Sequence, residues 1–336
     1  MRDVAEPEPE PVQTEPAPEP EPGEARTTAA GRTVSDDTPA PRPPRSQVGV
    51  TLPDPVTIDA RDARRTRSLR GYIGHLGWLW AHRTLIRKMA QVQLRLTVAQ
   101  SRLYYLWWLL DPLLETLCYA LLFLVIGRGQ SDGSAPLIAF LLTAMIPWKL
   151  TSACLDHATG VWGANRGLLD QIRFPSLVLL MARALSELWL YAVALGVLVI
   201  SNTIAGVRPT WTLLLLPGWV AIHALMALAL MPLMAIGTAY SQDLRKLIPY
   251  GTRLLFFASP ILYPVSALPD ALEPYAYANP LTMLTEGYRN ILLEGTAPDP
   301  GATTIFVGAL LLLLLLSSYL FIRLERSMIR SVGRIY

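Results

Sequence analysis

The chain has 336 residues, of which 52% are hydrophobic and only 16% are charged, and its mean hydropathy is +0.34. Several apolar stretches reach the ~20 residues that an α-helix needs to cross the hydrocarbon core of a bilayer. This composition excludes an ordinary cytosolic enzyme. The two cysteines, Cys118 and Cys154, both lie inside apolar stretches, so the sequence predicts neither a disulfide framework nor a cysteine-rich metal site.

Residues 1–60 differ from the rest of the chain in composition. They hold 13 of the 28 prolines and carry 5 basic and 12 acidic side chains, so this segment is strongly acidic although the whole chain has a net charge of +3. Between Glu6 and Glu24, Glu and Pro nearly alternate, which favours extended, solvated conformations without a core. We predict a disordered acidic tail over 1–60, with a regulatory docking segment as the alternative.

The next segment, 61–104, is rich in arginine and contains an amphipathic pattern. Apolar residues recur at three- and four-residue steps, with Arg and Lys between them; they are Met89, Val92, Leu96, Ala99 and Leu103. This spacing predicts a basic helix that lies in the inner membrane interface. A cytoplasmic helix packed on the rest of the protein is the alternative.

From residue 105 onward the sequence predicts an all-α membrane domain of six spans over 105–322, followed by a basic cytoplasmic C-terminus over 323–336. The expected spans are 105–126, 136–155, 177–204, 211–239, 247–268 and 302–322. Prolines interrupt the fifth span, and the stretch that follows is only half apolar. Since broken backbone is tolerated in a membrane only where protein or water covers it, this pattern predicts short re-entrant or interfacial helices between spans five and six.

The distribution of lysine and arginine predicts the orientation. The segments expected inside hold 19 basic residues and those expected outside hold 3. The inner segments are 61–104, 156–176, 240–253 and 323–336, and the outer ones are 127–135, 205–210 and 269–301. By the positive-inside rule, we expect a multi-pass protein of the plasma (inner) membrane with both termini in the cytoplasm.

Motifs for catalysis are missing from the sequence. It has no G-x-x-x-x-G-K-[ST] phosphate loop and no H-E-x-x-H zinc pair. Residues 129–133 match the G-x-S-x-G pattern, but they fall in a short polar loop between apolar stretches, where Gly, Ser and Asp are ordinary turn formers. We therefore expect a non-catalytic chain that holds no metal or cofactor.

Five ionisable residues fall within or at the edge of the apolar stretches: Asp111, Glu115, Lys149, Arg183 and Glu187. Each costs roughly 2.5–3.5 kcal/mol at a lipid-facing helix centre, so we expect them to face protein or a water-filled path. Arg183 and Glu187 are four residues apart and can pair along one helix face. Structural pairing and the lining of a polar path remain alternatives.

Four aromatic residues gather where the first span enters the membrane: Tyr104, Tyr105, Trp107 and Trp108. Aromatic belts at the interface explain such a cluster as an anchor. A stacking surface for sugar rings is the alternative.

Several motifs follow one another in an order that resembles a known family. They are WWLLDPL at 107–113, IPW at 146–148, N-x-x-L at 165–168 with RFP at 173–175, DLRKLIP at 243–249, FFASPILYP at 256–264, NPL at 279–281 and YR at 288–289. Together they resemble the membrane subunit of ABC-type polysaccharide exporters, which have an ABC type-2 membrane domain and include O-antigen, teichoic acid and galactan permeases. The sequence departs from the family pattern at Gln171, usually lysine, and at Tyr104, often glycine.

The resemblance implies a homodimeric half-transporter that pairs with two copies of a separate ATPase, which would hold ATP and Mg. The substrate would be a glycan linked to polyprenyl diphosphate, moved from inside to outside. Nucleic acid is not an expected partner, whereas membrane lipids are.

The resemblance also assigns candidate site residues. For contact with the ATPase they are Asn165, Leu168, Arg173, Phe174 and Pro175, with Asp243 and Arg245 in a second cytoplasmic loop. For the substrate channel they are Tyr104, Trp107, Trp108, Asp111 and Glu115. For the outer re-entrant region they are Pro260, Tyr263, Pro264, Asn279, Pro280, Tyr288 and Arg289.

Two other functions compete with this hypothesis. An ABC exporter of drugs or simple lipids would share the six-span plan. An intramembrane glycosyltransferase or acyltransferase would need an acidic or histidine cluster at one membrane face, and the four histidines are scattered.

Overall fold

The structure is a computed structural model, and it describes residues 74, 77, 79–99, 104–125, 137–171, 175–269 and 271–335. Helices and turns account for this part of the chain, which contains no strand. The predicted all-α class is therefore confirmed for the described residues. The predicted tail over 1–60 and the loop at 129–133 lie outside them.

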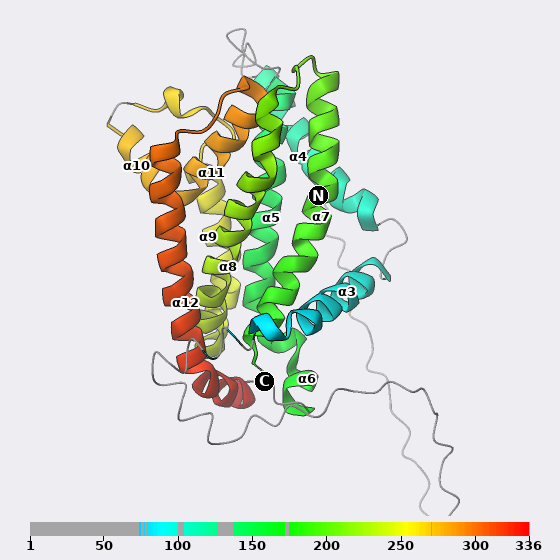
Figure 1. Cartoon of the computed structure of the whole chain (residues 1–336), viewed down its shortest axis with the longest axis vertical. Coiled ribbons are helices and arrows are strands. Elements are labelled where there is room, and N and C mark those ends of the chain that lie inside the picture. The colour runs from blue at the N-terminus through cyan, green and yellow to red at the C-terminus, as the bar shows by residue number, and fades with distance from the viewer. Residues whose placement is uncertain are drawn as a thin grey trace, which may run out of the picture. The chain divides into compact units, whose positions relative to one another are not determined.

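The helices follow the chain in the order shown in Figure 1. They are α3 (Arg83–Ala99), α4 (Tyr104–Val125), α5 (Leu137–Ala164), α6 (Arg166–Gln171), α7 (Leu177–Ile204), the 3-10 turn η1 (Trp211–Leu215), α8 (Leu216–Tyr240), α9 (Gln242–Ala258), the 3-10 turn η2 (Val265–Ala267), α10 (Glu273–Ala278), α11 (Pro280–Arg289), the π-helical turn η3 (Asn290–Glu294) and α12 (Pro300–Ile335).

Among the described residues, four helical segments are long and apolar enough to cross a membrane. They are Leu137–Ala164, Leu177–Ile204, Trp211–Tyr240 and Pro300–Val332. These four coincide with the second, third, fourth and sixth predicted spans. The first and fifth predicted spans correspond to α4 and α9, which are not among the four, so the six-span plan stays a prediction.

The fifth predicted span, 247–268, is wrong in its boundaries. Helix α9 runs from Gln242 to Ala258, so it includes much of the segment predicted as an inner loop. It ends where Ser259 takes an extended conformation (φ −95°, ψ 147°). The physical reason is Pro260, because a proline disfavours the helical conformation of the residue before it. Pro249 lies inside the helix without ending it.

Two other helices extend beyond their predicted spans. Helix α5 continues to Ala164, nine residues past the predicted end of span two, and α12 continues to Ile335 through the predicted C-terminal segment. A span predicted from hydropathy marks the apolar part of a helix, whereas the backbone hydrogen bonds continue into the polar part.

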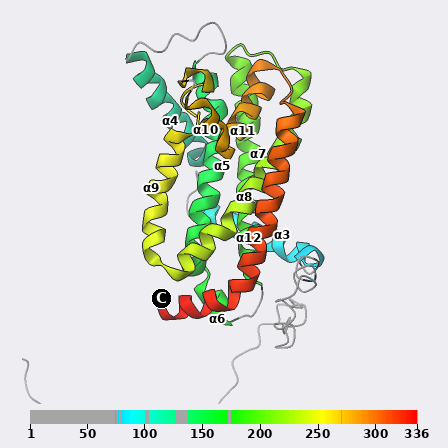
Figure 2. The ribbon, with the colours of Figure 1, turned by 90° about the vertical axis from the view of Figure 1, so that its left-hand side faces the viewer.

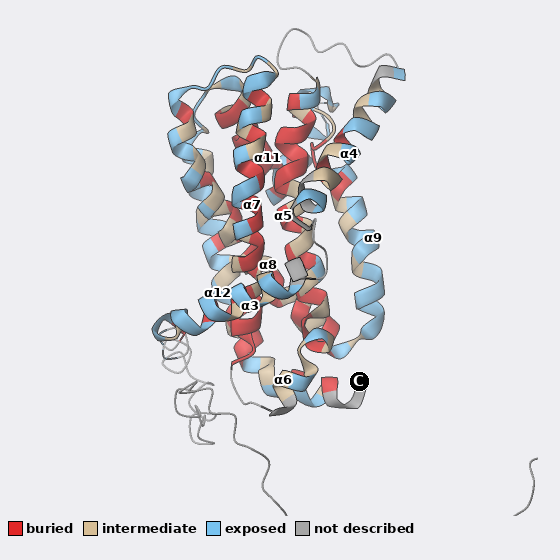
Figure 3. Cartoon of the chain, turned by 90° about the vertical axis from the view of Figure 1, so that its right-hand side faces the viewer, coloured by how far each residue is buried: buried red, intermediate tan, exposed pale blue. Residues whose placement is uncertain are grey.

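Helices α5, α7, α8 and α12 pack against one another as the centre of the bundle, and α3 crosses α7 obliquely (Figure 1). Figure 3 shows buried residues concentrated on α5 and α7, while most of α4 and α9 is exposed or half-buried. Leu79, Ile86 and Ala90 bury one face of the α3 region in the main core, and Trp80, Val92 and Leu96 are exposed. An amphipathic helix is thus present, and its place in a membrane interface stays a prediction.

The two ends of the bundle carry different elements. Helix α6 and the C-terminal part of α12 lie at one end, and α3 lies nearer to it, whereas α10 and α11 lie at the other end (Figures 1 and 2). Short helices between α9 and α12 were predicted, and α10 and α11 confirm them. In Figure 2, α12 turns at its end and runs across the base of the bundle.

Candidate functional site

The candidate residues for ATPase contact lie around α6. Asn165 joins α5 to α6: its Nδ2 donates to the Val161 carbonyl at 2.8 Å, and its own carbonyl accepts from the backbone N–H groups of Leu168 and Leu169 at 3.1 and 3.0 Å. Leu168 is half-buried against the main core. Pro175 is buried, and Arg173 and Phe174 lie outside the described residues. This end of the bundle therefore presents a short helix that follows directly on α5.

The second predicted cytoplasmic loop is part of a helix. Asp243 and Arg245 lie in the first turn and a half of α9 and are exposed. The Arg245 Nη2 atom lies 3.9 Å from the position that a Cβ would take on Gly160, near the end of α5. The structure thus brings the start of α9 close to the end of α5 that leads into α6. A shallow groove of about 320 Å³ runs beside it, between Ser241 and Tyr250.

The channel candidates lie on α4. Tyr104 and Trp108 are on its first turns, but their side chains are not described; Trp107 is 53% exposed. The Asp111 Oδ2 atom pairs with the Lys149 Nζ atom of α5 at 3.3 Å, while Glu115 is exposed. The sequence predicted that Asp111 and Lys149 would face protein or water, and the structure pairs them.

Helix α4 is attached to α5 and α9 by a small group of side chains. Thr116 is buried and donates from Oγ1 to the Pro112 carbonyl at 2.6 Å, with the Met145 sulfur 3.1 Å from the same atom. The ring of Phe256, on α9, lies 5.7 Å from that of Tyr119 on α4 and 5.5 Å from that of Trp148 on α5. Aromatic pairs at such distances stabilise by about 0.5–1.5 kcal/mol each beyond their buried area.

The outer-region candidates form one hydrogen-bonded unit, which we call the outer clasp: the loop 259–264, Asn279 and Arg289. The Asn279 side chain caps α11 by accepting from the Leu281 N–H at 3.0 Å, and its Nδ2 donates to the Ser259 hydroxyl at 2.8 Å. Pro260 is buried in the loop, Tyr263 is half-buried, and Pro264 and Pro280 are exposed; Pro280 begins α11. Proline is favoured at the first position of a helix, where its missing N–H costs nothing.

Arg289 holds the outer clasp together. It is 2% exposed and donates from Nη2 to the Ile261 carbonyl at 3.0 Å, and from Nη1 to the Glu286 Oε1 atom at 3.0 Å and to the Tyr263 carbonyl at 3.5 Å. Its guanidinium carbon lies 3.8 Å from the centre of the Phe140 ring. A buried cation needs such partners, because an uncompensated charge is costly away from water.

Tyr288, beside Arg289, belongs to a buried polar chain instead. Its hydroxyl lies 3.2 Å from His223 Nδ1 on α8, and His223 Nε2 lies 2.9 Å from the Thr151 hydroxyl on α5. Tyr288, His223 and Thr151 are each at most 1% exposed. The ring of Tyr191 on α7 meets both His223 and Tyr288 edge-on. This polar chain connects four helices, and it could not be predicted because His223 is isolated in an apolar stretch of the sequence.

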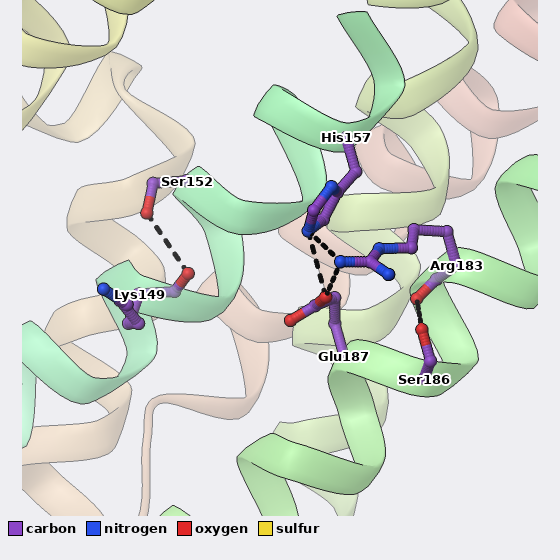
Figure 4. A network of polar contacts seen from close by, with 6 residues as sticks. All are labelled: Lys149, Ser152, His157, Arg183, Ser186 and Glu187. Carbon is purple, nitrogen blue, oxygen red and sulfur yellow. Dashed lines mark hydrogen bonds and ion pairs between the residues drawn. The ribbon is translucent and has the colours of Figure 1, made fainter. Parts of the chain in front are cut away.

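A second polar network, partly buried, joins α5 to α7 (Figure 4). Glu187 is 2% exposed; its Oε1 atom accepts from Arg183 Nη2 at 2.9 Å and lies 3.1 Å from His157 Nε2. Arg183 also contacts His157 directly. The predicted pairing of Arg183 with Glu187 is confirmed. The contribution of His157 was missed, because the register between α5 and α7 cannot be read from one sequence.

Comparison with known proteins adds to this geometry. The profile of the ABC-2 type transporter family matches residues 84–293, more than half of the chain. The chain belongs to the ABC-2 type transporter family. The matched range begins in α3 and ends in η3, so it contains every candidate site residue. The matched range does not include α12, the helix that carries two residues near the predicted ATPase contact that no motif predicted.

The ABC-2 transporter chain is similar in sequence to three curated relatives, two of them O-antigen export permeases and one a polysialic acid transport protein. It is 29% identical over 245 residues to the O-antigen export system permease protein RfbA of Myxococcus xanthus, covering 72% of this chain and 93% of the relative. It is 22% identical over 223 residues to the protein of the same name of Klebsiella pneumoniae (66% and 84%). It is 27% identical over 206 residues to the polysialic acid transport protein KpsM of Escherichia coli (60% and 79%).

Two residues of this ABC-2 transporter chain lie close to the predicted ATPase contact but were not predicted. Phe321 and Glu325, both on α12, contact Trp162 and Ser176 at the two sides of α6. No motif covers them, and periodicity within α12 gives no information about which helix it packs against. Among the described residues, no group of three His, Cys, Asp or Glu side chains is placed to hold a metal ion.

Proposed function

We propose that this chain is the membrane subunit of an ATP-driven exporter that moves a lipid-linked polysaccharide from the cytoplasmic to the outer side of the membrane. Membership of the ABC-2 transporter family carries the proposal. The names of the relatives, which refer to O-antigen export and polysialic acid transport, support a polysaccharide as the substrate.

The energy would come from a separate ATPase subunit, present in two copies, that binds ATP and Mg. The arrangement at one end of the bundle supports this. The start of α9 lies close there to the end of α5 that leads into α6, and α9 places Asp243 and Arg245 in solvent. A short helix between two long spans, packed on the main core through Leu168 and Leu169, is suited to pass a partner's movement into the bundle.

The substrate would pass along α4, between two copies of the chain. The side chains of Asp111 and Lys149 form an ion pair and are 48% and 27% exposed. Exposing these charges to lipid is costly, whereas exposing them to a water-filled path is not. Trp107 on the same helix offers a flat apolar surface to a sugar ring. A single copy cannot enclose a path on this face, so the proposal includes a homodimer.

The orientation that we propose places both termini and α6 in the cytoplasm and the outer clasp on the opposite side. The counts of basic residues on the two sides support it, at 19 against 3. The structure is compatible with it, since α6 and the C-terminal part of α12 lie at one end of the bundle and α10 and α11 at the other (Figure 2).

Purification in mild detergent from the native membrane tests the proposal. We expect a phosphate-loop ATPase to co-purify in equal amount with the chain, and the complex to hydrolyse ATP. Deleting the gene for this chain should leave the lipid-linked glycan inside the cell, as measured by its inaccessibility to a glycan-specific antibody on intact cells. A lone polypeptide without ATPase activity, from membranes that contain the chain in quantity, would contradict the proposal.

A further inference from the structure

We propose that Phe321 and Glu325 of α12 form a bracket that fixes both ends of the coupling segment, residues 162–176, to α12. The bracket makes α12 the element that carries a movement of α6 to the outer end of the bundle. This inference rests on the proposed function, because it takes α6 to be the helix that the ATPase moves.

The first contact of the bracket lies where the coupling segment begins. Trp162, near the end of α5, is 1% exposed, and its ring stacks on that of Phe321 with 6.0 Å between the centroids and 10° between the planes. The indole N–H donates to the Ala235 carbonyl of α8 at 2.7 Å. A ring held by stacking and by a hydrogen bond from its edge has one orientation available to it. The beginning of the segment is therefore fixed to α8 and α12 together.

The second contact lies where the segment ends. Ser176 precedes the first residue of α7, and both its N–H and its hydroxyl donate to the Glu325 Oε1 atom, at 2.5 and 2.6 Å. The Ser176 side chain does not cap its own helix, so the carboxylate of another helix takes that position. A negative charge is favourable at a helix N-terminus, where free N–H groups give a partial positive charge.

The two contacts belong to one face of α12. Residues 321 and 325 are four apart, which places them one turn from each other on the same side of a helix. Helix α12 runs from Pro300 to Ile335 and turns only near its C-terminal end (Figure 2). At a rise of about 1.5 Å per residue, it is long enough to connect the base of the bundle to the level of α10 and α11 (Figure 1).

The consequence is mechanical. Helix α6 lies between Trp162 and Ser176, which both contact α12, so a displacement of α6 that moves either residue also acts on α12. A push on α6 therefore reaches α12 directly, as well as α5 and α7, to which α6 is joined by the chain. Packed helices respond to such forces by shifting as units, which is the usual way in which small changes at one site reach another.

Spin labels test this inference in the complex of the chain with its co-purified ATPase, in lipid nanodiscs. In a background with Cys118→Ser, a label at Gly167→Cys reports on α6 and a label at Gly308→Cys on α12. Both glycines are exposed, and a side chain added at either meets no atom within 4 Å. One label per chain gives one distance between the two copies, measured with and without ATP and vanadate.

In the unmodified complex we expect ATP to change both distances. In Glu325→Gln we expect the change at Gly167 to persist and the change at Gly308 to be lost, while ATP hydrolysis continues. Phe321→Leu should act in the same direction, and Phe321→Tyr, which keeps the ring, should restore the response. Arg326→Gln, one residue along and exposed, is the matched control and should respond as the unmodified complex does.

The outcomes separate the two proposals. A response at Gly308 that survives both Glu325→Gln and Phe321→Leu overturns the bracket and leaves the proposed function intact. No ATP-dependent change at Gly167 in the unmodified complex overturns the coupling role of α6 and the bracket with it. If Phe321→Leu does not purify with its ATPase, the milder Glu325→Gln and Ser176→Ala decide, since each removes one hydrogen bond or one charge and leaves the ring stack in place.

Discussion

The bundle contains two hydrophobic clusters of very different size. The main core joins α3, α5, α7, α8, α11 and α12, with dozens of buried side chains packed together. The second cluster has four buried members, Ala144, Met145, Phe256 and Ile261; Phe256 is on α9, and Tyr119 of α4 packs against the cluster. The four apolar spans all belong to the main core, whereas α4 and α9 contribute only partly buried side chains such as Leu113 and Leu255 to it.

This difference separates a rigid part from a lightly attached one. Helices in a membrane are held together by van der Waals packing and by hydrogen bonds between helices, so α4 and α9, which bury fewer side chains, are held more weakly than the four central helices. Their exposed apolar residues, such as Leu121 and Leu254, form surfaces that fit contact with lipid or with a second chain. The proposed transport path lies on this weakly held side, where movement costs least.

The largest effect is expected in the main core, at Gly287 of α11. A Cβ built there lies 1.9 Å from the Cζ2 atom of Trp219, whose indole N–H is fixed by the Leu284 carbonyl at 3.0 Å. Gly287→Ala should lower the free energy of unfolding by about 3 kcal/mol or more, at the top of the usual range for overpacking, because the ring cannot withdraw.

The reactivity of Cys154 during heating measures this effect. Cys154 is buried in the main core, and it reports opening of the core when Cys118 is replaced by serine. Gly196→Ala, on α7 with no atom within 4 Å of the added carbon, is the control and should leave the midpoint unchanged or slightly raised. An equal midpoint for the two variants would show that α11 is not packed against Trp219.

Arg289 connects the two clusters, and its removal is expected to have the second largest effect. It donates to the Ile261 carbonyl of the small cluster, while its neighbour Tyr288 belongs to the main core. Arg289→Met should cost about 2–3 kcal/mol, because it leaves a buried carbonyl unpaired and removes charge-assisted hydrogen bonds.

The same Cys154 assay measures the loss, with Arg208→Met as the control, since Arg208 is exposed in the loop before η1. Protease cleavage within 264–272 should also accelerate in Arg289→Met, because the loop 259–264 loses its attachment to α11. Unchanged cleavage would mean that the Ser259–Asn279 hydrogen bond alone holds the outer clasp.

Much of the fold was predictable because hydropathy reports on the main core. Four predicted spans coincide with helices that are long and apolar enough to cross a membrane, and these four are the long helices of the main core. Pairs within one helix were also predictable, as for Arg183 and Glu187, because helical periodicity alone places them together. The boundaries of α9 were not predictable, since Pro249 was taken as a break and lies within the helix.

The site was predictable only where the resemblance supplied motifs. Those motifs named Asn279 and Arg289, and the structure joins both to the loop 259–264. Contacts between helices that are distant in sequence could not be found, because they depend on register and rotation. His157 beside Glu187 and Glu325 beside Ser176 are of this kind, and the members of the second pair are 149 positions apart in the sequence.

Phe256 tests the small cluster. A Phe→Ala substitution in a protein core usually costs about 3–5 kcal/mol of stability. For Phe256→Ala we expect about 2 kcal/mol, since lipid or detergent chains can fill the space that the ring leaves. A spin label at Gly251→Cys, exposed on α9, should become more mobile while the Cys154 midpoint falls less than in Gly287→Ala. Phe257→Ala, next along the helix and 56% exposed, is the control. A full loss of the main core on Phe256→Ala would show that the two clusters form one cooperative unit.

The smallest effect on stability is expected at the pair of Asp111 and Lys149, and it distinguishes folding from transport. Both side chains are more than a quarter exposed, so the pair contributes less than about 1 kcal/mol, and Asp111→Asn and Lys149→Gln should leave the Cys154 midpoint nearly unchanged. Export of the glycan should nevertheless fall in each single variant, because a water-filled path would lose its balance of charge. The charge-exchanged double variant, Asp111→Lys with Lys149→Asp, should recover part of it. If Asp111→Asn or Lys149→Gln lowers the Cys154 midpoint as far as Arg289→Met does, the pair contributes to the structural core and does not line the path.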